Sequence, residues 1–526
     1  MRRRLFEISF LIFLMLPALA GLFPPGFYQS QDGPSHLLRL AHFSQTFFDG
    51  QFPVRWISTL AYGLGTPLFL FNFPLPYYIG SLLLFLGFSV VASIEILFGA
   101  SMLLSGIFFY LWMRQRYPFF AAFTGALFYM WAPYRFLVMY HRAALGEAMA
   151  FLFIPLLFLF IDNILEKPRR KPIIGLAVSY GLLITTHNVA ALMTTGILLL
   201  YLLFQYSKTR AVRPLFMTII GLFLGIGLAG FFWIPAVVEV GWTRLPGLAA
   251  TTFPQHFVPP FALIRSAWEG GSIINGKTLG MSFQLGLIHI LIFIGSAALV
   301  FVKRTSRSLL YPLFWIGLTI LSVFLMLSPS EFLYKHIPGL AYVLYPWRFL
   351  GIAVFAIAVL ATWLTSHIPK LITVGLIALL FIANRNHIQT RPYNVSDREL
   401  LSPNISAGDM DDEFLPPWAD RQIRITRARE VGQPFPFIET IEMTPDQQRL
   451  RVNQYYFPGW KVLIDGKPAD IIVNKENGGR MDVLVPPDVK VIDARFTDTP
   501  IRTLANGLSI LSVLVVGFLL VKKQPS

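Results

Sequence analysis

Apolar runs long enough to cross a bilayer alternate with short clusters of Lys and Arg along most of the sequence. A membrane-spanning helix needs roughly 20 predominantly apolar residues. Of the 526 residues, 55% are hydrophobic and only 13% are charged, whereas soluble domains carry about 25% charged residues. We therefore predict a polytopic α-helical membrane protein with about twelve spans. The predicted spans are about 5–24, 94–113, 118–134, 148–164, 173–187, 189–206, 215–235, 284–302, 308–327, 349–366, 371–384 and 503–521.

The basic clusters predict how these spans are oriented. Cytoplasmic loops are enriched in Lys and Arg, so we place each cluster at the inner membrane surface and both termini in the cytoplasm. The first apolar run is interpreted as a retained span rather than a cleaved signal peptide. The same clusters account for the net charge of +15 without a nucleic-acid partner. They are residues 2–4, 114–116, 167–171, 208–213, 303–307, 367–370 and 522–523.

One further stretch, 74–92, is also apolar enough to cross the membrane. A crossing there would move the following basic clusters to the outer face, against the charge rule. We therefore predict a re-entrant or interfacial helix pair, opened by Pro74 and Pro76.

The sequence predicts three parts. Residues 1–384 form a multi-span domain with outer loops at 25–73, 134–147, 236–283 and 328–348. Residues 385–502 are less hydrophobic and alternate with period two, and Asp465-Gly466 and Asn477-Gly478-Gly479 are hairpin signals. This part is predicted to be a small extracytoplasmic β-sandwich. Residues 503–526 then form a final transmembrane helix and a short cytoplasmic tail.

Two acidic residues, Asp32 and Glu147, lie where predicted outer loops meet helices. Asp32 precedes a segment, 34–48, whose periodicity predicts an amphipathic interfacial helix, and an Asp there is also a good N-cap. Glu147 opens a span, where the helix dipole stabilises a carboxylate. An ionised group so close to the hydrocarbon is costly and often functional. For both residues the structural and the functional interpretation stay open.

Cationic side chains accompany these acids. Arg135, His141 and Arg142 share the short loop that ends at Glu147, and they suit either a lipid phosphate or a structural ion pair. Arg348 could hold a phosphate bidentately. Cysteine is absent, which excludes disulfides, thiolate metal sites and Cys nucleophiles. No phosphate-binding glycine loop, HExxH or GxSxG motif occurs in a credible context.

The early acid of the first outer loop and the acid that closes the second resemble the GT-C superfamily of membrane glycosyltransferases. More narrowly, the chain is similar to bacterial membrane proteins related to 6-pyruvoyl-tetrahydropterin synthase and to YfhO-like membrane proteins. No zinc–histidine triad for pterin chemistry accompanies that likeness. The motifs that carry it are DGPSH at 32–36, GQFPVRW at 50–56, YPWRF at 345–349 and YYFPGWK at 455–461.

The resemblance implies transfer of a sugar from a polyprenyl-phosphate donor on the outer face of the cell membrane of a bacterium. The acceptor would be an extracytoplasmic glycan, lipid or protein, and transfer usually proceeds with inversion. Asp32 would be the general base, and Glu147 would assist by binding the acceptor or a cation. The residues expected to stabilise the leaving phosphate are Arg135, His141, Arg142 and Arg348.

A substrate cavity is also implied by the resemblance, with the loop 236–283 shaping part of it. The superfamily admits a divalent metal, but a single Asp32 replaces the common acidic pair, which weakens the case for one, and we assign no metal ligand. The residues expected to line the cavity are His36, Arg55, His187, Asn188, Trp242, His256, Trp268, Lys277 and Trp347.

Two other classes of function are considered beside a glycosyltransferase. A lipid or polysaccharide transporter, or flippase, would place ionisable residues near the bilayer midplane and show internal repeats, whereas these acids lie at span ends. A non-catalytic envelope scaffold would act through 385–502 and would not need Asp32 or Glu147.

Overall fold

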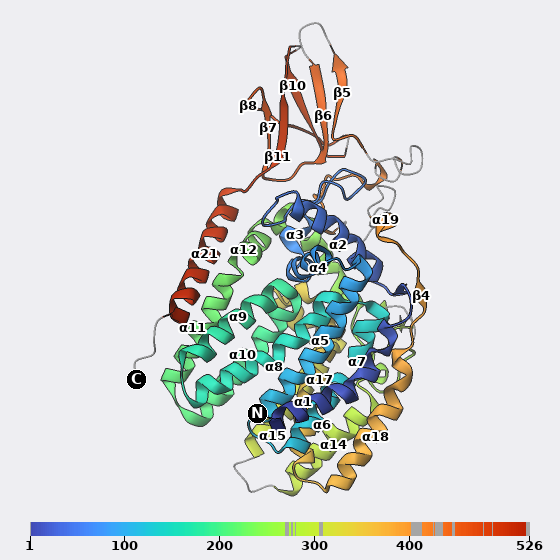
Figure 1. Ribbon diagram of the computed structural model, residues 1–526, viewed down its shortest axis with the longest axis vertical. Coiled ribbons are helices and arrows are strands. Elements are labelled where there is room, and N and C mark those ends of the chain that lie inside the picture. Colours follow the sequence, from blue (N-terminus) through green and yellow to red (C-terminus); the bar gives the residue numbers. More distant parts are fainter. Residues whose placement is uncertain are drawn as a thin grey trace.

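The computed structural model describes residues 2–268, 273–274, 277–278, 280–303, 309–400, 413–423, 426, 435–443, 448–476, 478–486 and 488–521. Helices form one bundle, and a β-rich domain stands on one end of it (Figure 1). This arrangement confirms the prediction of a polytopic helical protein with a small β-rich part. Most of the basic cluster 303–307 and all of 522–523 lie outside the described residues.

The long helices of the bundle follow the predicted apolar segments. Seven helices of the described chain are long and apolar enough to span a membrane, or up to nine if two bent pairs each count as one span. The bends are 72° between α11 and α12 and 90° between α15 and the turn before α16. The total of about twelve stays a prediction. The larger helices are α1 (Arg2–Met15), α5 (Val90–Met113), α6 (Phe119–Met130), α8 (Leu145–Glu166), α9 (Arg170–Thr186), α10 (Asn188–Thr209), α11 (Val212–Leu228), α12 (Gly230–Glu239), α14 (Leu287–Val302), α15 (Leu310–Met326), α17 (Leu350–Thr365), α18 (Lys370–Asn384) and α21 (Pro500–Val521).

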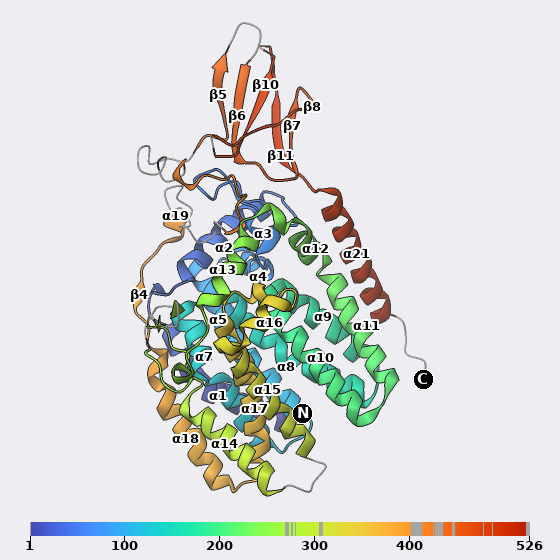
Figure 2. The ribbon, with the colours of Figure 1, turned by 180° about the vertical axis from the view of Figure 1, so that it is seen from behind.

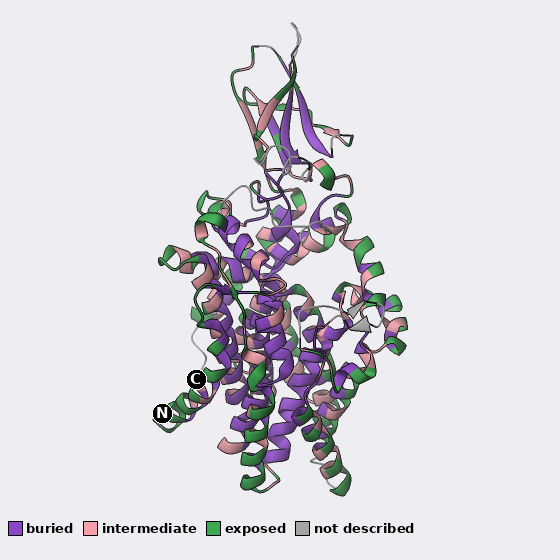
Figure 3. Ribbon diagram, turned by 90° about the vertical axis from the view of Figure 1, so that its right-hand side faces the viewer, coloured by how far each residue is buried: buried purple, intermediate pink, exposed green. Residues whose placement is uncertain are grey.

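The centre of the bundle is α17, every residue of which is buried. Helices α6, α14 and α15 pack around it, and Figure 3 shows this buried centre between exposed outer helices. Phe355 of α17 stacks on Trp112 at 5.5 Å and lies 5.3 Å from Phe158, measured between ring centroids. Large rings at such distances fill the interior of the bundle, where helices in lipid associate mainly through close packing.

The prediction of a helix pair at 74–92 is corrected by the structure. A single short helix, α4 (Leu75–Phe85), starts beside Pro74, and residues from Val90 on already belong to α5. The preceding α2 (Gly33–Phe48) is buried over most of its circumference, because α4 and α5 pack against it. It is therefore not the surface-lying amphipathic helix that its periodicity predicts.

Short helices cover the end of the bundle below the β-rich domain, and α13 and α16 lie on the side seen in Figure 2. Strand β1 of the first loop pairs with β4 after α18, so two distant segments meet there. These shorter elements are α3 (Leu68–Phe71), α7 (Pro133–Phe136), α13 (Leu245–Thr252), α16 (Glu331–His336), α19 (Asp397–Leu400), β1 (Phe27–Tyr28), β2 (Ile273–Ile274), β3 (Lys277–Thr278) and β4 (Pro392–Tyr393).

The β-rich domain consists of two small antiparallel sheets, ordered β5-β6-β10-β9 and β11-β7-β8. The predicted turn at Asp465-Gly466 is confirmed, because both residues have positive φ between the paired strands β7 and β8. Phe437 and Trp460 bring the sheets together, with 6.3 Å between their rings. The strands are β5 (Ile438–Met443), β6 (Gln448–Tyr455), β7 (Trp460–Ile464), β8 (Lys467–Ala469), β9 (Ile472–Asn474), β10 (Arg480–Val485) and β11 (Ile492–Phe496).

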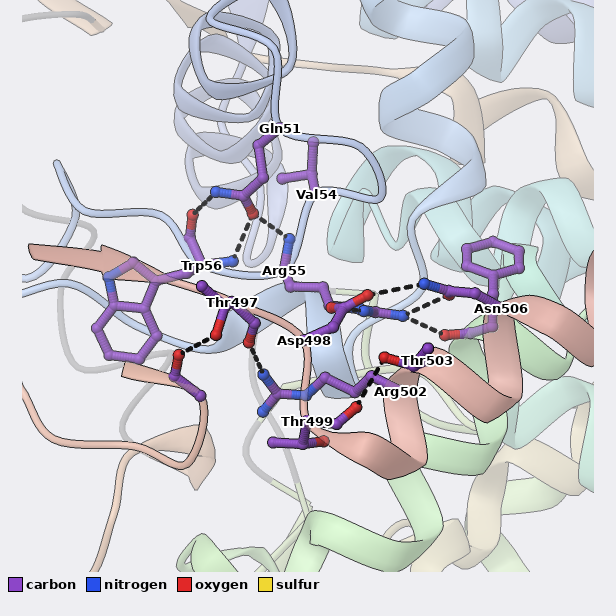
Figure 4. Close-up of polar contacts among 12 residues, drawn as sticks. Gln51, Val54, Arg55, Trp56, Thr497, Asp498, Thr499, Arg502, Thr503 and Asn506 are labelled. Atoms are coloured by element: carbon purple, nitrogen blue, oxygen red, sulfur yellow. Dashed lines mark hydrogen bonds and ion pairs between the residues drawn. The ribbon is translucent and has the colours of Figure 1, made fainter. Parts of the chain in front are cut away.

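Buried ion pairs attach the β-rich domain and α21 to the bundle. Arg502 of α21 donates to Glu239 of α12 at 2.9 Å and to the carbonyl oxygen of Pro458 at 2.8 Å. Arg55 of the first loop pairs with Asp498 and donates to Asn506 at 2.9 Å (Figure 4). Unpaired charges in these positions would be costly, so the joint between domain and bundle is fixed.

Asp482 of β10 holds the larger sheet through its charge. Its buried carboxylate accepts hydrogen bonds from Arg451 at 2.8 Å and Arg449 at 2.9 Å. Burial raises the pKa of Asp482, but these bonds and one from Asn474 outweigh it, so the pKa is lowered overall. The charged form is therefore the one that stabilises the sheet, and this contribution is lost as the pH falls through the lowered pKa.

We expect Asp482→Asn to loosen the β-rich domain, because removing one partner of a buried ion pair costs about 3–5 kcal/mol. Amide hydrogen exchange in β6 and β10 should become about a hundredfold faster or more. Asp493→Asn is the matched control, since Asp493 is exposed and pairs with Arg495 at 3.4 Å on the surface. Equal protection in the two variants would show that the buried pair does not hold the sheet.

Candidate functional site

The candidate site is built around a π-helical turn between α7 and α8. Residues Leu137–Arg142 form this turn after α7, and Ala143 then takes a left-handed conformation with φ 52° before α8 begins. Single π-turns are often found at functional positions. The segment 134–147, predicted to be an outer loop, is therefore helical and almost wholly buried.

The first loop is fastened to this turn by its backbone. The N–H of Gln31 donates to the carbonyl oxygen of His141 at 3.0 Å, and the N–H of Asp32 donates to that of Arg142 at 2.8 Å. Asp32 stands at the N-cap position of α2, yet its side chain makes no capping hydrogen bond. The capping interpretation of the Asp32 side chain is therefore wrong.

The two singled-out carboxylates meet at one guanidinium. Arg142 donates to Glu147 at 2.7 Å and lies 3.7 Å from the nearer oxygen of Asp32. The second oxygen of Glu147 accepts from the hydroxyl of Tyr134. The side chain of Glu147 is 4% exposed and that of Asp32 is 36% exposed. Asp32 is thus the carboxylate that a substrate can reach, and Glu147 lies behind it.

A polar cavity of about 430 Å³ opens in front of these residues. Trp347 lies under the guanidinium of Arg142, with 4.5 Å from the guanidinium carbon to the ring centroid. Arg348 donates to the carbonyl oxygen of Val343 at 2.8 Å, and its Nε is buried without a partner. The charged groups that line the cavity are Asp32, Glu147, Glu413, Arg39, Arg142 and Arg348.

An apolar cavity of about 470 Å³ adjoins the polar one. The start of α10 and the length of α12 supply part of its lining, including Leu192 and Val237, which are 43% and 64% exposed. Aliphatic side chains exposed on the outside of a helical membrane bundle suit contact with lipid tails. The residues that line both cavities are Asn72, Phe73, His187, Leu344, Arg348, Glu413 and Phe414.

Two buried histidines of the polar cavity are neutral. Burial, together with nearby Arg side chains, keeps the pKa of His36 well below its usual range and lowers that of His187 to about 3. His36 bonds Tyr77 through Nδ1 at 2.7 Å and accepts the N–H of Leu145 on Nε2 at 3.4 Å. These bonds fix the start of α8 against α2. Burial lowers the pKa of Arg142 as well, but Glu147 and Asp32 raise it more, so the pKa of Arg142 is raised overall.

The structure brings about half of the predicted site residues together. Seven of them line the polar cavity: Asp32, Glu147, Arg142, Arg348, His36, His187 and Trp347. Asn188 lines the apolar cavity and donates to the carbonyl oxygen of Phe71 at 3.3 Å. The side chain of Lys277 lies outside the described residues.

Other predicted residues lie away from both cavities. Arg135 is buried in the bundle, where it donates to Ser105 at 2.8 Å and lies over the ring of Phe151 at 4.2 Å. Arg55 belongs to the joint with α21. Neither guanidinium can reach a ligand in the polar cavity, so their expected roles in phosphate binding and cavity lining are corrected.

Four aromatic or imidazole rings predicted at the site take part in other contacts. His141 lies edge-on to Trp268 at 5.1 Å, and Trp268 stacks on His387 at 3.6 Å. Trp242 packs edge-on against Trp418 at 5.9 Å. His256 contacts Tyr345 at 4.8 Å and so lies behind a residue that does line the polar cavity.

Sequence reasoning missed several cavity residues, notably Arg39, Glu413 and Phe414. Phe414 stacks on Phe71 at 6.0 Å, which places a segment of the stretch 385–502 in the wall of both cavities. Leu344, in the same wall, has φ 62°, a conformation rare for residues with a Cβ. This unusual conformation points to the cavity wall, but φ is known only from the structure, so nothing in the sequence indicates it.

The described residues contain no group of three His, Asp or Glu side chains that could hold a metal ion. Two of the carboxylates that line the polar cavity, Asp32 and Glu147, are close enough to share one partner, and that partner is the guanidinium of Arg142. The donor set of the polar cavity therefore does not fit a divalent metal.

Comparison with known proteins places the chain among membrane proteins. Residues 69–392, more than half of the chain, match a family of membrane proteins described as 6-pyruvoyl-tetrahydropterin synthase related. An uncharacterized protein of Lactococcus lactis subsp. cremoris (strain MG1363) is 24% identical over 343 residues, which cover 60% of this chain and 54% of that protein. The chain thus spans about half the length of this curated relative.

Two solved structures are similar to the chain at low identity. The arabinofuranosyltransferase AftD from Mycobacteria is 14% identical with a TM-score of 0.40, over 74% of this chain and 26% of that one. An oligosaccharyltransferase of Archaeoglobus fulgidus in its apo form is 13% identical with a TM-score of 0.47, over 82% of this chain and 60% of that one. The extent of the family match confirms the narrower resemblance: the chain belongs to the 6-pyruvoyl-tetrahydropterin synthase related family of membrane proteins.

Proposed function

We propose that the protein is a glycosyltransferase that moves a sugar from a polyprenyl-phosphate donor to an acceptor at the outer face of the membrane. One observation carries the proposal. A polar cavity holding Asp32, Arg142 and Glu147 shares a wall with an apolar cavity, and Arg348 lies in that wall. A substrate with a polar head and an isoprenoid chain matches this pair of cavities.

The apolar cavity suits the isoprenoid chain of the donor. Leu192 and Val237 line this cavity and are also exposed on the outside of the bundle. A chain that enters between α10 and α12 would therefore stay in contact with lipid, so it need not be transferred into water. Its phosphate would then lie at Arg348, whose guanidinium is suited to phosphate oxygens.

The polar cavity suits the chemical step. Asp32 accepts a proton from the acceptor hydroxyl, whose oxygen forms a bond to the anomeric carbon of the sugar. The bond from that carbon to the phosphate oxygen breaks, and its electron pair leaves with the polyprenyl phosphate. Arg348 stabilises the charge that develops on this oxygen. Asp32 suits the role of base because its side chain is partly exposed to the cavity.

The topology supports activity on the outer face. Helix α21 leads away from the β-rich domain along the bundle, and α2 and α3 lie next to that domain (Figure 1). If both termini are cytoplasmic, as the basic clusters predict, the β-rich domain and the polar cavity are extracytoplasmic. We place the protein in the plasma membrane of a bacterium, with a glycan, lipid or protein outside it as the acceptor.

Asp32→Asn should lower sugar transfer by about a thousandfold, because a general base contributes typically 10²–10⁴ in rate. The assay would follow labelled sugar from a panel of polyprenyl-phosphate sugars into product, with the purified protein in liposomes. Asp49→Asn is the control, since Asp49 ends α2 at an exposed position. Equal rates for Asp32→Asn and the wild type would remove the assigned base. Lipid movement across the bilayer without any product would favour a flippase.

Arg348→Ala should weaken binding of polyprenyl phosphate by about tenfold to a hundredfold, because a hydrogen bond to a charged group contributes roughly 1.5–3 kcal/mol. Titration of the lipid into detergent-solubilised protein would measure this. Arg265→Ala serves as the comparison, since Arg265 is an exposed arginine in the loop 236–283 and lines neither cavity. An unchanged affinity in Arg348→Ala would place the phosphate elsewhere.

A further inference from the structure

We propose that the guanidinium of Arg142 takes the place of a divalent cation at this site, so that the protein works without a metal. The inference rests on the proposed function for its reaction, but its evidence lies in the geometry of Arg142 and the two carboxylates. Arg142 then acts as a positioning residue: it holds Asp32 and Glu147 in place rather than binding the donor phosphate.

Both oxygens of Glu147 already accept a hydrogen bond, so a metal would compete with donors that are in place. One oxygen accepts from Arg142 at 2.7 Å and the other accepts from Tyr134. Magnesium requires ligand oxygens at about 2.0–2.1 Å in near-octahedral geometry. A metal bound between Asp32 and Glu147 would have to displace the guanidinium, which is itself held over the ring of Trp347.

The charges that line the polar cavity are already matched. Three carboxylates, Asp32, Glu147 and Glu413, face three guanidinium groups, Arg39, Arg142 and Arg348. A divalent cation would add two uncompensated charges beside an apolar cavity, where charges are poorly screened. The phosphodiester of a polyprenyl-phosphate sugar would add one negative charge, half the magnitude that a divalent cation adds, and the unpartnered Nε–H of Arg348 can donate a hydrogen bond to it.

The backbone keeps Arg142 in this position. The carbonyl oxygen of Arg142 accepts the N–H of Asp32, while its guanidinium contacts the Asp32 carboxylate. The left-handed Ala143 then turns the chain so that Glu147 follows in the first turn of α8. One residue therefore sets the positions of both acids before any substrate binds, which is the preorganisation that catalysis requires.

The test is binding of Mn²⁺ to the purified full chain, followed by electron paramagnetic resonance. The wild type should bind no more Mn²⁺ than Asp32→Asn. Arg142→Ala should bind it at least about tenfold more tightly, since removing the guanidinium frees two carboxylates for a metal. Adding Asp32→Asn to Arg142→Ala should abolish that gain. If Arg142→Ala does not fold, comparing Mn²⁺ binding by the wild type and by Asp32→Asn still shows whether the wild type has a metal site at Asp32.

A Mn²⁺ site in the wild type that Asp32→Asn removes would overturn the proposal. So would a folded Arg142→Ala protein that gains no Mn²⁺ site. Transfer by the wild type should be unchanged by EDTA, and a loss that Mn²⁺ restores would overturn it as well. If no polyprenyl-phosphate sugar is turned over, the proposed function fails, while the Mn²⁺ measurement still decides the role of Arg142.

Discussion

The ion pair between Arg142 and Glu147, extended to Asp32, is the interaction on which the geometry of the site depends. Charged side chains this close to a bilayer remain only where they are paired. Here the pairing joins three segments: the first loop, the π-turn and the start of α8. Two backbone hydrogen bonds between the first loop and the π-turn reinforce the same junction. The acids are therefore neighbours because the fold must satisfy one buried guanidinium.

The same junction determines which surfaces a substrate can meet. Arg142 and Glu147 line the polar cavity as buried groups, and Arg348 lines both the polar and the apolar cavity. His36 and His187 lie on the walls as neutral rings, with pKa values lowered by burial. The cavity therefore carries its charge on carboxylates and guanidinium groups alone, so its charge balance should vary little near neutral pH.

Much of this architecture could be predicted from the sequence, because apolar length and basic clusters report directly on membrane crossing. The sequence could not tell which of the two arginines, Arg135 or Arg142, lines the polar cavity. In a regular α-helix residues seven apart lie on nearly the same face, which would send both side chains the same way. The π-turn has more residues per turn, so Arg142 reaches the cavity while Arg135 points into the bundle. No local sequence pattern marks Glu413 and Phe414 as cavity residues, because only the tertiary fold brings them to the cavity.

The β-rich domain is connected to the site more closely than a boundary near residue 384 suggests. Arg55 and Arg502 fix the domain and α21 to the first loop and to α12, which lines the apolar cavity. Arg244 donates its N–H to the carbonyl oxygen of Leu415, beside the cavity residues Glu413 and Phe414. A displacement of the domain would therefore move α12 and this wall together. The β-rich domain therefore helps to hold the walls of the cavities in place. The domain and the helical bundle form one structural unit.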